Sequence, residues 1–380
     1  MKITEVTSTI LKSYEYPHGG WVLVRVKADE GLEGIGECFV PDQHGQGVLA
    51  AQAVLEGSLK RVVIGEDPLD IEVIWERMYA VCRSLYDRRG LAIHALSGVD
   101  MALYDLAGKA LGVPVHKLLG GRFRDKVKVY VSSIWVDEER PQSALEATTR
   151  YVAQGFRAIK YYGWAGFGRN PKRDSSLLRA IREAAGEGID LMLDLGRPAS
   201  LTEAIKVARM IEASEAGISW WEEPLCSSDD AEGLARLAAS TDITIAAGER
   251  EMTAFGFRDL ILKRAVDLLQ PDLSWVGGLT EGKRIAEMAR LFNVPLVPHN
   301  WGTMVNFAAS VHLVASMPQG FLCEYPITPR TPEARIASPM MTELVRTPLA
   351  IENGYAVVPT KPGLGIELDE EAVRKYTWAA

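Results

Sequence analysis

The chain has 380 residues, enough for one large domain and a smaller one, and its 47% hydrophobic and 24% charged content is that of an ordinary globular protein. Its 42 basic and 50 acidic residues give a formal net charge of −8, and no basic run is interleaved with aromatics, so we expect neither nucleic acid nor an anionic membrane as a partner. The N-terminal stretch lacks the apolar core of a signal peptide, and no apolar run is long enough to span a bilayer.

The four cysteines lie far apart and form no CxxC pair, so the sequence indicates neither a disulfide framework nor a thiolate zinc site. They are Cys38, Cys82, Cys226 and Cys323. We therefore expect a cytoplasmic protein with free thiols.

The first part of the chain predicts a separate α+β domain over residues 1–122. Residues 21–39, WVLVRVKADEGLEGIGECF, show the alternation of antiparallel strands with a tight turn near Asp29–Gly31, and helical patterns follow. The tail 356–380 again has turn-rich strand character, and we expect it to return to this domain.

Residues 123–355 predict a (β/α) barrel. Short apolar segments alternate with amphipathic ones, and their near-continuous apolar character is typical of parallel strands buried on both faces. The predicted strands are 127–133, 158–162, 189–194, 218–222, 243–249, 266–272, 294–299 and 321–324. Ser200 with Glu203 predicts a capping box for one intervening helix, and Thr280 the cap of another. Eight strands with helices between them are what a (β/α)8 barrel needs.

Ionisable residues close seven consecutive predicted strands. In chain order they are Lys160, Asp194, Glu222, Glu249, Asp272, His299 and Glu324. The carboxyl ends of barrel strands form the mouth of the active site, so we expect these side chains to converge there.

Three of these residues predict a metal site. Asp194, Glu222 and Glu249 come from adjacent strands, and three carboxylates in one pocket repel one another unless a cation lies among them. An all-oxygen set suits Mg²⁺, with Mn²⁺ as the alternative ion. Glu223 is the rival ligand within WWEEP, but strand alternation allows only one of the two glutamates to point inward.

Asp272 and His299 predict a general base. A carboxylate bonded to one imidazole nitrogen fixes the tautomer and leaves the other nitrogen free to take a proton. A metal facing such a base predicts removal of the proton α to a substrate carboxylate, with the cation stabilising the resulting enediolate.

The chain resembles the enolase superfamily, in its mandelate racemase subgroup, from about residue 3 to 370. The motifs that carry the resemblance are GIGE (34–37), SGVDMALYDLAGKALGVPVHKLLGG (97–121), WWEEPL (220–225), AAGE (246–249), QPDLSWVGGLTE (270–281), VPHNWGT (297–303) and PGLGIEL (362–368). The resemblance implies an α+β capping domain over a modified (β/α)7β barrel, with the active site between them, and a symmetric homo-oligomer.

The same resemblance implies roles for the strand-end residues. Asp194, Glu222 and Glu249 match the Mg²⁺ ligands, and Asp272 and His299 match the base dyad. Two further matches concern the substrate carboxylate: Glu324 matches the acid that hydrogen-bonds it, and Lys160 the lysine that lies near it.

The stretch Lys160-Tyr161-Tyr162 departs from the family pattern. Members that move protons on both faces of a carbon carry Lys-x-Lys here, whereas this chain has Tyr162 in place of the second lysine. A phenol is a poor base at neutral pH but a serviceable hydrogen-bond donor or acid. A second departure is Gly196, which replaces an asparagine often found two residues after the first ligand.

One strong base favours a reaction that needs a single proton abstraction. The resemblance to subgroup members with a single His–Asp base then implies dehydration of an acid sugar, an aldonate or aldarate, to a 2-keto-3-deoxy acid. The alternatives are a sugar-acid epimerase or racemase, a sugar-lactone cycloisomerase and, outside enzymes, a non-catalytic protein that binds carboxylate or metal. The resemblance assigns substrate selection to cap loops, and the residues that we expect to contact the small-molecule carboxylate substrate are His18, His44, Tyr86 and Arg89.

Overall fold

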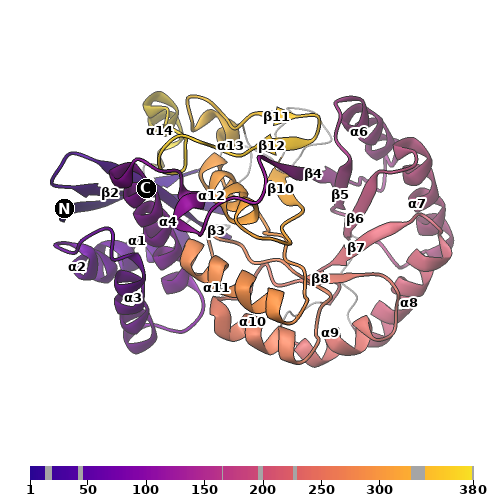
Figure 1. Ribbon diagram of the computed structural model, residues 1–380. Helices are drawn as coiled ribbons and strands as arrows, with labels where there is room; N and C mark the ends of the chain where they lie inside the picture. Colours follow the sequence, from indigo (N-terminus) through magenta and orange to yellow (C-terminus); the bar gives the residue numbers. More distant parts are fainter. Residues whose placement is uncertain are drawn as a thin grey trace.

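Two bodies of secondary structure lie side by side in the computed structural model, an N-terminal α+β body and a larger α/β barrel (Figure 1). The structure describes residues 1–12, 19–41, 46–164, 166–195, 200–225, 229–326 and 339–378. We call the elements from β1 to α5 the cap and those from β4 to β10 the barrel. The bounds that we predict for the two domains stay a prediction.

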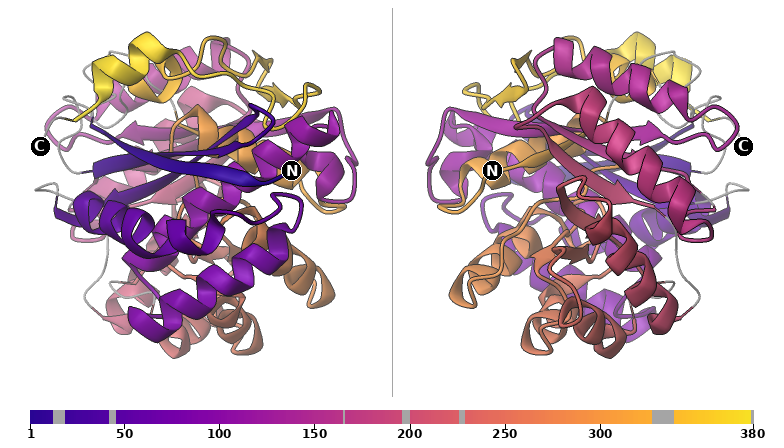
Figure 2. Two further views of the ribbon diagram at one scale, coloured as in Figure 1. Left: turned by 90° about the vertical axis from the view of Figure 1, so that its left-hand side faces the viewer. Right: turned by 90° about the vertical axis from the view of Figure 1, so that its right-hand side faces the viewer.

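The cap begins with an antiparallel sheet followed by helices (Figure 2, left). Its strands are β1 (Ile3–Leu11), β2 (Gly19–Ala28) and β3 (Glu33–Pro41). Its helical segments are α1 (Gln46–Val54), the π-helical turn η1 (Leu55–Leu59), α2 (Lys60–Val63), α3 (Ile71–Leu85), α4 (Leu91–Leu111) and α5 (Val115–Leu118). The predicted tight turn joins β2 to β3, and Gly31 has φ +80° there, a conformation that glycine adopts at little steric cost.

Helix α4 lies directly against β3 because the GIGE motif leaves room for its backbone. A Cβ on Gly34 would lie 2.1 Å from the Ala102 carbonyl oxygen, and one on Gly36 would lie 2.1 Å from the Gly98 carbonyl oxygen. Any side chain at either position would push the helix off the strand. The motif thus fixes the strand that carries Glu37.

The barrel alternates strands and helices (Figure 1). Its strands are β4 (Lys126–Trp135), β5 (Ala158–Tyr162), β6 (Asp190–Asp194), β7 (Ile218–Glu222), β8 (Ile245–Ala247), β9 (Leu268–Leu269) and β10 (Cys323–Pro326). Its helices are α6 (Gln142–Ala153), α7 (Pro171–Ala185), α8 (Leu201–Ala213), α9 (Ala231–Ala238), α10 (Thr253–Leu262), α11 (Gly278–Leu291) and α12 (Met304–Ala315).

Neighbouring barrel strands pair in parallel from β4 to β9, and β10 returns to pair in parallel with β4. The segment after α11 supplies the remaining strand position through bridges at Leu296 and His299. Over the described residues this gives eight strand positions with seven helices between them, so the fold is the modified (β/α)7β barrel with an α+β cap. The magenta and red helices lie outside the strands (Figure 2, right).

The second half of the barrel has shorter strands than predicted. The segments predicted over 243–249 and 266–272 shrink to β8 and β9, and that over 294–299 is reduced to two bridges. Prolines explain the last two cases, because Pro271, Pro295 and Pro298 have no N–H to donate to a neighbouring strand.

Three details of the predicted elements are wrong. Lys160 is the third residue of β5, and Glu324 is the second residue of β10, so neither closes its strand. Thr280 lies inside the first turn of α11, whose cap residue is Gly277. The predicted cap at Ser200 is confirmed, since its side chain accepts a hydrogen bond from the Glu203 N–H.

The tail contacts both bodies. Its elements are α13 (Met340–Glu343), β11 (Ile351–Glu352), β12 (Tyr355–Val357) and α14 (Glu370–Tyr376). β12, which contains residue 356, pairs with β4 of the barrel, and contacts with the cap follow further along the tail. Leu364 N–H donates to Asp105 of α4, and the Trp378 N–H donates to the Ile10 carbonyl of β1.

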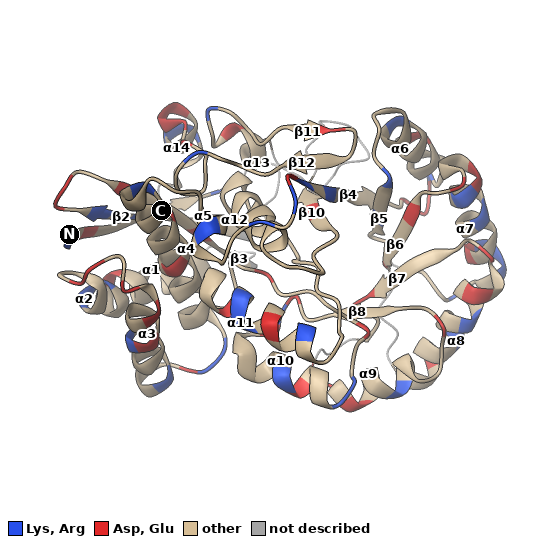
Figure 3. Ribbon diagram, in the orientation of Figure 1, with Lys and Arg blue, Asp and Glu red and all other residues tan. Residues whose placement is uncertain are grey.

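The cap and the barrel share a buried apolar core, in which Trp21 and Phe39 of the cap belong to one cluster with Trp275 and Phe307 of the barrel. Burial of such side chains stabilises each by about 1.5–3 kcal/mol, so the two bodies are expected to dock firmly. Basic and acidic residues are interspersed along the outer helices (Figure 3). Among the described residues, none of the helices combines the length and apolar character needed to cross a membrane.

Candidate active site

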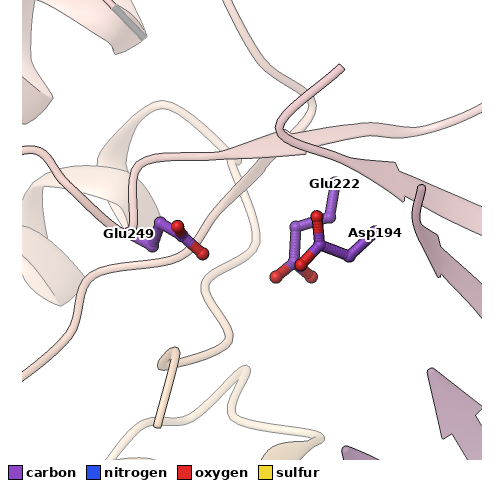
Figure 4. Close-up of side chains that lie close together, drawn as sticks. All are labelled: Asp194, Glu222 and Glu249. Atoms are coloured by element: carbon purple, nitrogen blue, oxygen red, sulfur yellow. The ribbon is translucent and has the colours of Figure 1, made fainter. Parts of the chain in front are cut away.

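The predicted carboxylate triad assembles at the carboxyl ends of three adjacent strands. Asp194 ends β6, Glu222 ends β7, and Glu249 lies two residues beyond β8. One carboxylate oxygen from each lies within 4.8 Å of the others, and Figure 4 shows the three carboxylates facing a common space. Because three such charges repel at this distance, the set is suited to hold a divalent cation through oxygen ligands.

Of the two glutamates in WWEEP, Glu222 belongs to the triad and Glu223 does not, in line with strand alternation, which allows only one of them to point inward. Glu223 has φ +45° and accepts a hydrogen bond of 2.9 Å from the Gly248 N–H. This bond holds the residue before Glu249, so the second glutamate of WWEEP supports the third member of the triad.

Lys160 is buried inside the barrel, where it balances part of this negative charge. Its Nζ lies 2.5 Å from Glu222 Oε1 and 2.8 Å from Glu324 Oε1, and the side chain is 2% exposed. Burial lowers the pKa of Lys160, but Glu222, Glu324 and Asp194 outweigh it and raise the pKa above its usual value. Lys160 is therefore a charged residue buried beneath the carboxylates, and its ammonium group does not reach the solvent.

Two further side chains hold Glu222, and the sequence analysis missed both. Gln270 Nε2 donates to Glu222 Oε2 at 2.7 Å, and the Trp220 indole N–H donates to the same oxygen at 3.2 Å. The sequence QPD (270–272) contained a signal for Gln270, because side chains two residues apart on a strand lie on the same face, which places Gln270 beside Asp272.

The predicted base dyad forms at the next strand positions. His299 Nδ1 donates to Asp272 Oδ2 over 2.7 Å, and the two residues are joined by a parallel backbone bridge. His299 Nε2 points toward the triad, 3.4 Å from Glu249 Oε2. Burial lowers the pKa of His299, but Glu324, Glu249 and Asp272 outweigh it and raise the pKa to about 10.

Asp272 is held by its other oxygen as well. Asp272 Oδ1 accepts hydrogen bonds from the Ser274 N–H at 2.7 Å, the Ser274 hydroxyl at 2.6 Å and Asn306 Nδ2 at 3.1 Å. The carboxylate is buried with every oxygen bonded, so its orientation toward His299 is fixed by the protein itself.

Glu324 is buried between the dyad and Lys160. Its Oε2 accepts a hydrogen bond of 2.7 Å from the Asn300 N–H. Burial opposes ionisation of this carboxyl, but Lys160 and His299 outweigh it and hold its pKa below the usual range. Glu324 is therefore present as a carboxylate in this arrangement.

Tyr162 ends β5 and pairs in register with Asp194, so it lies beside the triad. Strand alternation puts it on the same face as Lys160, while Tyr161 points outward and bonds to Thr148 of α6. The Trp135 ring packs edge-on against Tyr162, with the ring centroids 5.5 Å apart.

Two of the four predicted substrate-contact residues, Tyr86 and Arg89, lie in the described part of the cap. His18 and His44 lie outside the described residues, as does Gly196. The Tyr86 hydroxyl bonds to Ser58 at 2.7 Å. Arg89 reaches from the cap to the barrel, where its guanidinium lies 2.9 Å from Asp229 and 3.1 Å from Glu251.

Arg250 is a charged residue of the site that the sequence analysis missed. Its Nε lies 3.3 Å from Glu249 Oε1, and its side chain is 56% exposed. The signal was its place directly after a predicted metal ligand.

Two family models match the chain. The model described as enolase C-terminal domain-like matches residues 143–372, and the model of the mandelate racemase / muconate lactonizing enzyme N-terminal domain matches residues 16–120. Together they cover most of the barrel and the cap.

Curated relatives and solved structures are similar over nearly the whole chain. D-galactarolactone cycloisomerase from Agrobacterium fabrum is 35% identical over 99% of both chains. D-xylonate dehydratase from Haloferax volcanii is 32% identical over 99% of this chain and 89% of its own length. The crystal structure of 3,6-anhydro-D-galactonate cycloisomerase from Zobellia galactanivorans superposes with a TM-score of 0.87 at 33% identity, covering 100% of both chains.

Proposed function

We propose that this chain, which belongs to the mandelate racemase / muconate lactonizing enzyme family, is a Mg²⁺-dependent dehydratase of an acid sugar. The reaction converts an aldonate or aldarate to a 2-keto-3-deoxy acid. The observation that carries the proposal is a single strong base beside the triad: His299 Nε2 faces Glu249 at 3.4 Å, and Tyr162 stands where a second lysine would supply an opposed base.

Asp194, Glu222 and Glu249 are the proposed Mg²⁺ ligands, with Mn²⁺ as the alternative ion. The donor set fits a hard cation, because it offers carboxylate oxygens only and Lys160 already balances one of the three charges. When bound, the cation supplies positive charge that holds the substrate carboxylate and stabilises the charge left on it as the α-proton departs.

His299 is the proposed base. Its Nδ1–H is committed to Asp272, so the neutral imidazole presents a free lone pair on Nε2. The pKa of about 10 reflects the surrounding carboxylates, and compensating the charge of Glu249 returns the pKa of His299 toward the range of a base. The α-proton passes to Nε2, and the same proton then leaves with the β-hydroxyl as water; the enol that remains tautomerises to the keto acid.

Two residues support this step. Lys160, in the proposed role, presents its charge near the substrate carboxylate while remaining paired with Glu222 and Glu324. Tyr162 is the proposed hydrogen-bond donor to the departing hydroxyl, because a phenol with a pKa near 10 donates readily and abstracts protons poorly at neutral pH.

A sugar-lactone cycloisomerase is the second candidate, and the similarity to the Agrobacterium and Zobellia cycloisomerases favours it. The same base and triad serve both reactions, and the outcome depends on which group leaves the β-carbon. His18, His44, Tyr86 and Arg89 stay proposed substrate contacts, and a homo-oligomer stays the proposed assembly.

The test is a screen of the purified protein with Mg²⁺ against aldonates, aldarates and their lactones in D₂O. Mass spectrometry and a colour reaction for 2-keto acids follow the products. We expect loss of one water from one substrate, abolished by EDTA and by His299→Ala. Deuterium gain or lactone opening without water loss would instead establish an epimerase or cycloisomerase. Binding without any turnover or exchange would mean a non-catalytic protein.

A further inference from the structure

Strand β3 of the cap directs two side chains toward the base dyad of the barrel. Glu37 and Phe39 lie two residues apart and therefore on one face of the strand, and both are buried. Each begins a chain of contacts that ends on one member of the dyad.

The first chain of contacts starts with Glu37 and the N-terminus of α12. Glu37 Oε1 accepts hydrogen bonds from the Thr303 N–H at 2.7 Å and the Asn306 N–H at 3.3 Å, and Glu37 Oε2 accepts one from the Thr303 hydroxyl. A carboxylate bonded to the first turn of a helix satisfies N–H groups that have no partner within the helix.

Gly302 shows how closely this carboxylate fits. A Cβ on Gly302 would lie 2.2 Å from Glu37 Oε1 and 2.4 Å from the Asn306 Cβ. The turn before α12 therefore admits no side chain, and Glu37 fixes the place of the helix start.

Asn306 continues the contacts to the dyad. Its Nδ2 donates to Asp272 Oδ1 at 3.1 Å and to Asn300 Oδ1 at 2.9 Å. Since Asp272 Oδ2 holds His299 Nδ1, a shift of the first turn of α12 would change the angle of this carboxylate and of the imidazole bonded to it.

The second chain of contacts is aromatic. Phe39 stacks on Trp275 with the ring centroids 5.6 Å apart and the planes 10° apart, and Trp275 packs against His299 at 5.9 Å. His94 of α4 also stacks on Trp275, with the ring centroids 5.4 Å apart. Its Nδ1–H donates a hydrogen bond to the Phe39 carbonyl.

We propose that Glu37 is a positioning residue for the Asp272–His299 base, so that docking of the cap onto α12 sets the orientation of the imidazole. The inference rests on the proposed function of His299, and it gives the cap a part in the chemistry besides substrate contact. A misplacement of about 1 Å costs about a hundredfold in rate, so small movements of α12 are expected to be visible in kcat.

Asp100 offers a matched control. It is also a buried carboxylate of the cap on the first turn of a barrel helix, where it accepts hydrogen bonds from the Thr280 N–H at 3.0 Å and the Thr280 hydroxyl at 2.6 Å. Within the described residues, however, no side chain of α11 bonds to Asp272 or His299.

The experiment compares Glu37→Ala, Glu37→Gln, Asn306→Ala and Asp100→Ala in the Mg²⁺-loaded enzyme. We expect Glu37→Ala and Asn306→Ala to lower kcat about 10- to 100-fold with KM changed less than about threefold. Glu37→Gln keeps an acceptor oxygen and should restore most of kcat, while Asp100→Ala should change kcat less than about threefold. Equal losses of kcat in Glu37→Ala and Asp100→Ala, or a change in KM alone, would overturn the proposal.

A readout without turnover separates this inference from the proposed function. The Nδ1–H proton of His299, assigned by its loss in His299→Ala, should give a downfield NMR signal in the wild type, Glu37→Gln and Asp100→Ala, and a shifted or lost signal in Asn306→Ala. Asn306→Ala keeps the backbone N–H that donates to Glu37. An unchanged signal in this variant would contradict the proposal even if Glu37→Ala fails to fold. Absence of dehydration in the wild type, with the signal behaving as expected, would count only against the proposed function.

Discussion

Carboxylates gather at both ends of the site, but their charges are balanced in different ways. At the triad end, carboxylate oxygens of Asp194, Glu222 and Glu249 lie within 4.8 Å of one another, with Lys160 2.5 Å from Glu222 and the exposed Arg250 3.3 Å from Glu249. At the dyad end, the Asp272 carboxylate is bonded on both oxygens to side chains and backbone of the same chain. The comparison teaches that the protein alone orients the Asp272 carboxylate, whereas the three crowded carboxylates of the triad form a group suited to hold a divalent cation.

The largest expected effect tests the dyad end. Replacing the base in His299→Ala should lower kcat by about 10²–10⁴-fold, because general-base catalysis contributes that much. The affinity for Mn²⁺, measured by titration with electron paramagnetic resonance, should change less than about threefold. A comparable loss of metal affinity would show that the two ends are not independent.

Metal removal tests the triad end. A cation at about 100 times its Kd should stabilise the fold by about 2.7 kcal/mol, visible as a rise in Tm on adding Mg²⁺ to EDTA-treated protein. Glu249→Gln should abolish this rise, while His299→Ala should keep it. A rise in Tm that survives Glu249→Gln would place the cation elsewhere.

Glu37 sharpens the comparison, because this buried carboxylate accepts its hydrogen bonds among the described residues from the neutral donors Thr303 and Asn306, with the charge of Asp272 nearby. Burial raises the pKa of Glu37 from 4.5 to about 7, with hydrogen bonds from Thr303 opposing the rise. The folded state therefore binds the proton more tightly than the unfolded state. Its contribution to stability is fully present below pH 4.5, falls by about 1.4 kcal/mol per pH unit up to about pH 7, and is then constant.

The check is denaturant unfolding of the wild type and Glu37→Gln at pH 5 and pH 8. Relative to the wild type, the variant should be more stable at pH 8 than at pH 5, because the amide carries no charge to bury. A difference that is equal at the two pH values would contradict the raised pKa.

The smallest expected effect concerns Tyr162. Tyr162→Phe removes one hydrogen-bond donor, worth about 1 kcal/mol, and should lower kcat by about 3- to 10-fold with the triad and dyad intact. Steady-state kinetics with the substrate found in the screen measures it. A loss as large as that of His299→Ala would make Tyr162 an essential acid.

Much of the architecture could be predicted from the order of apolar segments along the chain. β5, β6 and β7 lie where their apolar runs predict, and Asp194 and Glu222 are the residues at which two of these runs end. The short second half could not be predicted as well, since Pro271 and Pro298 interrupt pairing without changing the apolar pattern.

The contacts within the site were predictable only in part. The Asp272–His299 pair follows from adjacent strand positions. The depth of Lys160 does not, because a long side chain can reach the site from the middle of a strand. The bonds between Glu37 and Thr303 join residues 266 positions apart, and no local pattern encodes such a pairing.

The pairing of β10 with β4 has a consequence for how the chain is made. Lys160 emerges from the ribosome well before Glu324, and until Cys323–Pro326 is synthesised the exposed edge of β4 has no partner on that side. Open strand edges and uncompensated charges disfavour stable partial folds. The barrel is therefore expected to fold late and cooperatively, and its lysine to take up its final place only when the last strand closes the ring.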